Sequence, residues 1–161
     1  MKSKTNFLRE ARLDDVEVLA EFNIELARET EGVQLDPKVI RAGVKAVLED
    51  SAKGMYFVAE RDGTVVGALM VTYEWSDWRN ARFLWIQSVY VTSEFRHQGV
   101  FKTLYNHVQQ LGSRDGYCGV RLYAHLHNDR AINSYRNLGM RHYDYLVFET
   151  ADALRGDSPA G

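Results

Sequence analysis

The sequence contains very little cysteine and has no long apolar run. Cys118 is the only cysteine among 161 residues, which excludes an intramolecular disulfide framework and a zinc site built from cysteines. No segment approaches about 18 uninterrupted apolar residues, and the N-terminal stretch has no apolar signal core. We therefore expect no membrane partner and a cytoplasmic location.

The sequence also has no large excess of positive or negative charge. The formal net charge is −2, with 26% charged and 45% hydrophobic residues, so the composition indicates neither a disordered chain nor a nucleic-acid-binding tail. A chain of this length buries roughly 68–70% of its unfolded surface, which suffices for a real core. We expect one domain over residues 1–150 and a flexible tail over residues 151–161, where Gly, Pro and Ser replace apolar periodicity.

Apolar spacing and turn residues predict the order β-α-α-β-β-β-α-β-α-β. Asp14 and Glu17 resemble a capping box at the first helix, Asp36-Pro37 marks the start of the second, and Asp62-Gly63 marks a hairpin. We expect strands at residues 7–11, 55–61, 64–75, 82–91, 118–126 and 142–149, and helices at about 14–27, 37–48, 100–114 and 128–138. Hairpins mixed with two β-α crossovers predict an α/β or α+β fold, with a mixed sheet covered by helices. The strand at 82–91 is apolar on both faces and should be central.

The junction from Val89 to Val108 changes from a β-branched run to helical spacing, and the change falls at Gly99. A helix N-terminus offers unpaired N–H groups and partial positive charge, which together favour an anion such as phosphate. Arg96, His97 and Lys102 add positive charge around the same turn. One glycine is too few for a dinucleotide fingerprint, and no glycine stands directly before Lys102 as a Walker motif requires. The alternative is that Gly99 only eases a turn and Arg96 is a solvated surface charge.

Two motifs together resemble the GCN5-related N-acetyltransferase (GNAT) family: Val91-x4-Arg96-x2-Gly99-Val-Phe, and Asn128-x2-Ala131-x3-Tyr135-x3-Gly139. The resemblance implies a mostly antiparallel sheet split between its fourth and fifth strands and flanked by helices, with acetyl-CoA as cofactor. It assigns the thioester to backbone N–H groups near the end of the central strand and the pyrophosphate to the turn. The implied cofactor-binding residues are Val89, Tyr90, Val91, Arg96, His97, Gln98, Gly99, Val100, Phe101, Lys102, Asn128 and Tyr135. Phe101 replaces the family's usual Gly or Ala, so we expect its side chain to turn away from the cofactor.

Acyl transfer to an amine requires a base, because an alkyl amine with a pKa near about 10 arrives protonated. Glu74 is the first candidate for this base. Asp77, Glu25 or a water ordered by Gln87 are the alternatives. The resemblance makes Tyr135 the acid for the departing thiolate, whereas a core tyrosine is the alternative. Asn128 suits a helix cap as well as a cofactor contact.

Aromatic and acidic residues suggest where an acceptor would bind. The proposed substrate-binding residues are Glu25, Trp75, Trp78, Trp85 and Gln87, although the tryptophans could equally be core. Five acidic residues suggest that the entrance to the acceptor site is acidic and suited to a cationic amine: Glu25, Glu29, Glu31, Glu74 and Asp77. The alternative is that they lie on solvated helix faces. His125, His127 and Asp129 alternate as strand residues do, but we expect no metal, since Asp129 falls at a helix cap and the family requires none.

The leading hypothesis is an N-acetyltransferase that moves an acetyl group from acetyl-CoA directly to a primary amine of a small molecule or peptide. A single cysteine argues against a covalent acetyl-enzyme. The alternative is a non-catalytic acyl-CoA-binding regulatory module. An exposed strand in the C-terminal segment would allow a homodimer.

Overall fold

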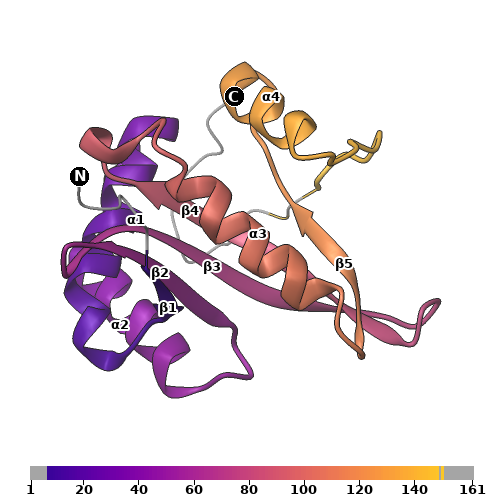
Figure 1. The fold of residues 1–161 in the computed structure, drawn as a ribbon, viewed down its shortest axis with the longest axis horizontal. Helices are drawn as coiled ribbons and strands as arrows, with labels where there is room; N and C mark the ends of the chain where they lie inside the picture. Colours follow the sequence, from indigo (N-terminus) through magenta and orange to yellow (C-terminus); the bar gives the residue numbers. More distant parts are fainter. Residues whose placement is uncertain (1–6, 149, 151–161) are drawn as a thin grey trace. The chain divides into compact units, whose positions relative to one another are not determined.

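The computed structural model describes residues 7–148 and residue 150, and Figure 1 shows the course of the chain. The chain divides into two compact units, the first ending at Tyr123 and the second beginning at Ala124. Among the residues described, no helix has both the length and the apolar character needed to cross a membrane.

The first unit is built on a five-stranded sheet with the strand order β1-β2-β3-β4-β5. The strands β1 to β4 pair antiparallel in succession, and β5 joins β4 in parallel. This confirms the predicted mixed, mostly antiparallel sheet. The strand bounds are β1 (Phe7–Glu10), β2 (Met55–Arg61), β3 (Thr64–Ser76), β4 (Ala81–Val91) and β5 (Tyr117–Leu122).

Helices cover both faces of this sheet. They are α1 (Val16–Glu31), α2 (Pro37–Glu49) and α3 (Val100–Gly112), with short 3-10 helices η1 (Leu13–Asp15) and η2 (Ser93–Phe95). Ala68 of β3 belongs to a buried cluster with Leu19 of α1 and Val44 of α2. Its neighbour Gly67 faces α3, because a Cβ there would lie 2.8 Å from a Val100 methyl group. Since strand side chains alternate, α1 and α2 cover one face and α3 crosses the other (Figure 1).

Two local signals are confirmed. Asp62 and Gly63 turn the β2–β3 hairpin with φ angles of 52° and 79°, as an Asp-Gly turn predicts. Asp36 caps α2 by accepting a 2.8 Å hydrogen bond from the Lys38 N–H, and Pro37 is the first helical residue.

The capping box predicted at Asp14 and Glu17 is wrong. The carboxylate of Asp15 instead accepts a 2.7 Å bond from the Arg12 N–H and closes the 3-10 turn before α1. Asp15 is also held by Arg9, and this ion pair between β1 and the helix start favours Asp15 over its exposed neighbour.

The pairing of β4 changes along its length, and this change positions the candidate site. Met70 pairs with Ser88 and Val71 with Ile86, so Gln87 is an extra residue that forms a β-bulge. The partnership with β5 ends at Ile86 and Leu122, whereas β4 continues to Val91. β5 itself ends at Leu122, so the last residues of β4 have no described strand on that side, at the place where we expected the two strands to part.

The second unit contains α4 (Asp129–Asn137). The strand predicted at residues 142–149 is wrong for residues 142–148, which adopt no regular structure, while Glu149 lies outside the described residues, as does the expected tail at 151–161. Apolar alternation alone does not make a strand, because its backbone needs a neighbouring edge. Tyr145 and Phe148 remain 84% and 89% exposed, and no described residue pairs with this segment.

Candidate active site

The turn between β4 and α3 leaves the start of α3 without a side-chain cap. Gly99 occupies the N-cap position with φ of 82°, a left-handed conformation that favours glycine. The first intrahelical bond is the 3.0 Å bond from the Thr103 N–H to the Gly99 carbonyl. The N–H groups that precede Thr103 in a helix have no acceptor within it, so this end is suited to an anion from outside.

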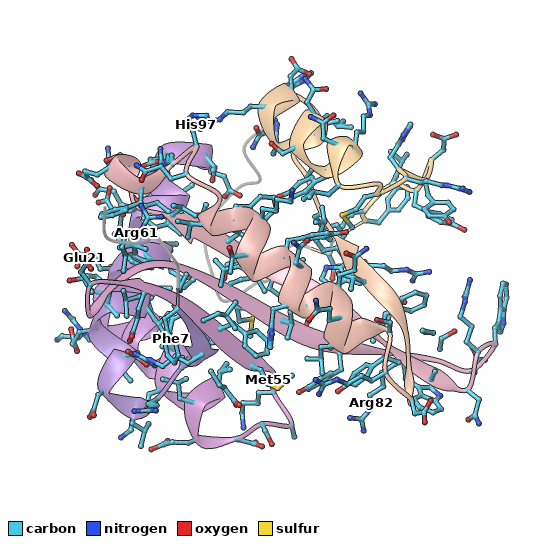
Figure 2. All side chains as sticks on the ribbon, viewed as in Figure 1. Phe7, Glu21, Met55, Arg61, Arg82 and His97 are labelled. Atoms are coloured by element: carbon cyan, nitrogen blue, oxygen red, sulfur yellow. The ribbon has the colours of Figure 1, made fainter. Side chains whose placement is uncertain are left out.

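A second left-handed residue, His97, gives the turn its shape. Its φ of 60° is unfavourable for a side chain with a Cβ, so surrounding contacts have to hold it. Arg61 of β2 supplies one such contact by donating a 2.5 Å hydrogen bond to the Gln98 side chain, and its guanidinium lies 5.1 Å from the centre of the Phe95 ring. The amide of Gln98 in turn donates to the Glu94 carbonyl at 2.7 Å. Figure 2 labels Arg61 and His97 at this end of the sheet.

Arg96 is directed toward α1. Its Nε donates to the Val91 carbonyl at 2.8 Å, and its Nη2 forms a 2.7 Å ion pair with Glu29. The guanidinium also lies 5.4 Å from the ring centre of Tyr90, whose hydroxyl donates to the same carboxylate at 3.2 Å. Much of the charge of Arg96 is therefore already balanced within the protein. Lys102, on the first turn of α3, is a further cation and is exposed.

The side chain of Phe101, which replaces the small residue of the family motif, lies 6.0 Å from the Tyr105 ring on the next turn of α3. The predicted orientation of Phe101 relative to a cofactor stays a prediction.

The end of β4 supplies backbone groups where the strands part. Val89, Tyr90 and Val91 pair with β3 but lie beyond the last residue that pairs with β5. Alternate N–H groups of a strand point to opposite sides. Some N–H groups of residues 89–91 therefore point away from β3, toward the side where β5 pairs with the earlier part of β4. Burial, and then the Glu29 carboxylate, raise the pKa of the Tyr90 hydroxyl, which therefore stays neutral at neutral pH.

Glu74 lies on the face of β3 that carries Ala68, and its carboxylate has a partner. Arg121 of β5 donates to Glu74 at 2.6 Å and lies 3.8 Å from the centre of the Phe83 ring on the strand between them. The sequence indicated the strand that carries Arg121, but not its role as the partner of Glu74. The available signal was a basic residue on a strand two positions away in the sheet, on the far side of β4 from Glu74.

The three tryptophans do not gather in one cluster. Trp75 lies on the opposite face of β3 from Glu74, at a shallow hollow lined by Ser51, Ala52, Tyr73, Trp75 and Arg82. Trp78 is 92% exposed in the turn between β3 and β4. Trp85 lies against Tyr123, with ring centres 4.7 Å apart, and its buried Nε1 has no hydrogen-bond partner among the described residues.

The remaining predicted acceptor residues are engaged in polar contacts. Gln87 at the bulge donates a 2.9 Å hydrogen bond to the Thr72 hydroxyl. Glu25 pairs with Arg28 on the same helix. Neither contact removes the whole side chain from solvent, so both remain candidates for an acceptor site.

In the second unit, Asn128 caps α4 by accepting a 3.1 Å bond from the Ala131 N–H. Tyr135 lies on this helix, and burial raises the pKa of its hydroxyl above the ordinary 10.0. The hydroxyl is therefore protonated at neutral pH, which a proton donor requires. Among the described residues, no three His, Cys, Asp or Glu side chains gather as metal ligands.

Comparisons with known proteins agree with this arrangement. Residues 19–140 match the model of the acetyltransferase (GNAT) family. A structure described as a possible acetyltransferase from Clostridium difficile 630 is 46% identical, covers 91% of this chain and 97% of its own, and has a TM-score of 0.86. No curated protein matches the sequence significantly.

Two more distant structures share the fold. One is a ribosomal-protein-alanine N-acetyltransferase from Brucella melitensis biovar Abortus 2308, at 16% identity, 92% and 100% coverage and a TM-score of 0.73. The other is the aminoglycoside N-acetyltransferase AAC(6')-Iy in complex with CoA, at 16% identity, 94% and 99% coverage and a TM-score of 0.76.

Proposed function

Because the chain belongs to the acetyltransferase (GNAT) family, we propose that it transfers an acetyl group from acetyl-CoA to a primary amine. When bound, acetyl-CoA supplies an acetyl thioester, an activated acyl group. The acceptor is a small molecule or a peptide, since relatives with this fold include enzymes named for an aminoglycoside and for a protein alanine.

The uncapped start of α3 is the observation that carries this proposal. The first N–H groups of a helix are satisfied by a side-chain cap, by water or by a ligand, and α4 has a side-chain cap in Asn128 whereas α3 has none. At α3 a glycine without a Cβ stands in the cap position, and a Cβ placed there would meet no atom within 4 Å. This fits the close approach of a pyrophosphate to the backbone.

The chain offers groups for each remaining requirement of the reaction. Backbone donors near Val89 to Val91 would stabilise negative charge on the carbonyl oxygen under attack. Glu74 would accept the amine proton, directly or through a water held by Gln87, and Asp77 is the alternative base. The Tyr135 hydroxyl would donate a proton to the departing sulfur.

The test is release of free thiol from acetyl-CoA in the presence of a panel of amines. The panel includes an aminoglycoside, a peptide with N-terminal alanine and a polyamine. Amine-dependent release that exceeds simple hydrolysis supports the proposal. Absence of both thiol release and acetyl-CoA binding would contradict it.

A second candidate is a non-catalytic acyl-CoA-binding module. The observation that favours it is the Glu74–Arg121 ion pair, which occupies the candidate base. Tight acetyl-CoA binding without turnover on any amine of the panel would support this reading.

A further inference from the structure

A closed set of contacts joins α1 to the turn that precedes α3. Glu29, on the last turn of α1, holds Arg96 with one carboxylate oxygen at 2.7 Å and accepts from the Tyr90 hydroxyl with the other at 3.2 Å. Arg96 closes the set by lying over the Tyr90 ring and donating to the Val91 carbonyl. The side chains of Arg96 and Glu29 are only 27% and 33% exposed, so solvent screens this pair less than a fully exposed one.

The position of this set along the chain matters. Arg96 lies three residues before Gly99 and directly before His97, the residue in the unfavourable left-handed conformation. Such a conformation persists only where neighbouring contacts impose it. Both neighbours of His97 are held by side chains from other elements. Arg61 contacts Gln98, the residue after it, and Glu29 contacts Arg96, the residue before it.

Contacts within the protein already engage two N–H groups of Arg96. A guanidinium carries five N–H donors, and the contacts to Val91 and Glu29 use the Nε and Nη2 atoms. Glu29 balances the charge of Arg96, and the guanidinium packs against the Tyr90 ring. Arg96 is therefore better placed to hold the backbone of the turn than to neutralise a phosphate.

We propose that Glu29 is a positioning residue for the cofactor turn, which it holds in its anion-binding shape by bracing Arg96. Arg96 then supports the backbone conformation of the turn and is not a phosphate ligand. This inference rests on the proposed function, because it names how the same site is held ready for coenzyme A.

The test is a double-mutant cycle on coenzyme A affinity, measured by calorimetry, with melting temperature, kcat and KM on the same preparations. Glu29→Ala and Arg96→Gln should each weaken coenzyme A binding by about five- to tenfold. The double variant should bind no more weakly than Arg96→Gln alone. The loss should fall on KM for acetyl-CoA, while kcat at saturation stays within about twofold.

Two further variants sharpen the test. Glu29→Gln keeps an acceptor oxygen and the size of the side chain, so it should retain part of the affinity and the full melting temperature. Glu17→Ala removes a more exposed pair with Arg41 from the same helix and should leave coenzyme A affinity unchanged.

Each other outcome overturns the inference. Tighter binding in Glu29→Ala would mean that Glu29 competes with phosphate for Arg96. Additive losses in the double variant would mean that the two residues act independently, and unchanged affinity in both single variants would mean that neither braces the turn. Failure of the unmodified protein to bind coenzyme A would instead overturn the proposed function, and the inference with it.

Discussion

At the residue scale, the two side chains proposed to move protons have different surroundings. Tyr135 has a pKa raised by burial, so its hydroxyl keeps its proton at neutral pH. Glu74 is held by Arg121 at 2.6 Å, which orients one carboxylate oxygen and leaves the other to act. The Tyr135 hydroxyl can therefore donate a proton at neutral pH, whereas in the proposed mechanism Glu74 would accept a proton beside the Arg121 guanidinium.

Replacing Tyr135 by Phe removes only the hydroxyl. If this hydroxyl protonates the leaving sulfur, Tyr135→Phe should lower kcat by at least about tenfold, since positioned general acids typically contribute about 10²–10⁴-fold. Acetyl-CoA affinity and melting temperature should remain close to those of the unmodified protein, because the ring is kept. Full activity in a stably folded Tyr135→Phe preparation would remove Tyr135 from the acid role.

Glu74→Gln tests the base while it keeps a side chain that can still accept from Arg121. We expect kcat to fall by about 10²-fold with little change in acetyl-CoA affinity, because an amide cannot take the amine proton. Steady-state kinetics at several pH values, run beside Asp77→Asn, measure this. An unchanged rate in Glu74→Gln with a loss in Asp77→Asn would move the role to Asp77, and no loss in either would assign it to water.

At the element scale, β1 and the start of α1 are joined by the buried carboxylate of Asp15. Arg9 donates to both of its oxygens, at 2.7 and 2.9 Å, and also pairs with Glu60 of β2. The hydrogen bond from Arg9, opposed in part by burial, lowers the pKa of Asp15 below 3.8. This pair therefore stabilises the folded chain in its ionised form.

The sign of the resulting pH dependence follows from the lowered pKa. The stabilisation by Asp15 is fully present well above pH 3.8, shrinks as the pH falls through that value and is lost below the folded-state pKa. Asp15→Asn should lower the free energy of unfolding at pH 7 by about 2–3 kcal/mol, and this difference should narrow as the pH approaches 3. Urea unfolding at several pH values measures it.

Asp14→Asn is the matched control for Asp15→Asn, because Asp14 is the exposed neighbour. Its effect should stay within about 0.5 kcal/mol at every pH. Equal effects of the two substitutions would show that the Arg9–Asp15 pair contributes no special stability.

Elements set by local chemistry could be predicted from the sequence. The Asp62-Gly63 hairpin and the Asp36-Pro37 helix start depend on residues adjacent in the chain, and both formed as expected. The Glu29–Arg96 and Glu74–Arg121 pairs join residues 67 and 47 positions apart. Many charged residues could have met in their place, so only the folded chain identifies these partners.

The expected strand is absent from residues 142–148 for a related reason. Its aromatic and apolar residues make a valid strand pattern, but a strand also needs an edge to pair with. The pattern carries no information about that edge. The parting of β4 and β5, by contrast, came from the resemblance of the motifs to a family and not from periodicity.

At the scale of the whole molecule, the proposed cofactor site is one helix end of a chain that belongs to the GNAT acetyltransferases. Acetyl-CoA should bind at micromolar affinity and raise the melting temperature, because a ligand that binds only the folded state stabilises it by about 2.7 kcal/mol at a hundred times its Kd. Thermal unfolding with increasing acetyl-CoA checks this. A melting temperature that does not depend on acetyl-CoA would contradict the cofactor assignment.

The most direct measurement is acetyl-CoA affinity, by calorimetry, for the unmodified protein, Gly99→Leu and Gly116→Leu. Both glycines have left-handed backbones, with φ of 82° and 87°, and a Cβ at either would meet no atom within 4 Å. The two variants should therefore lose similar amounts of stability, but only Gly99 lies at the start of α3. We expect Gly116→Leu to bind acetyl-CoA normally and Gly99→Leu to lose detectable binding. Equal affinity in the two variants would contradict the placement of the pyrophosphate at this helix end.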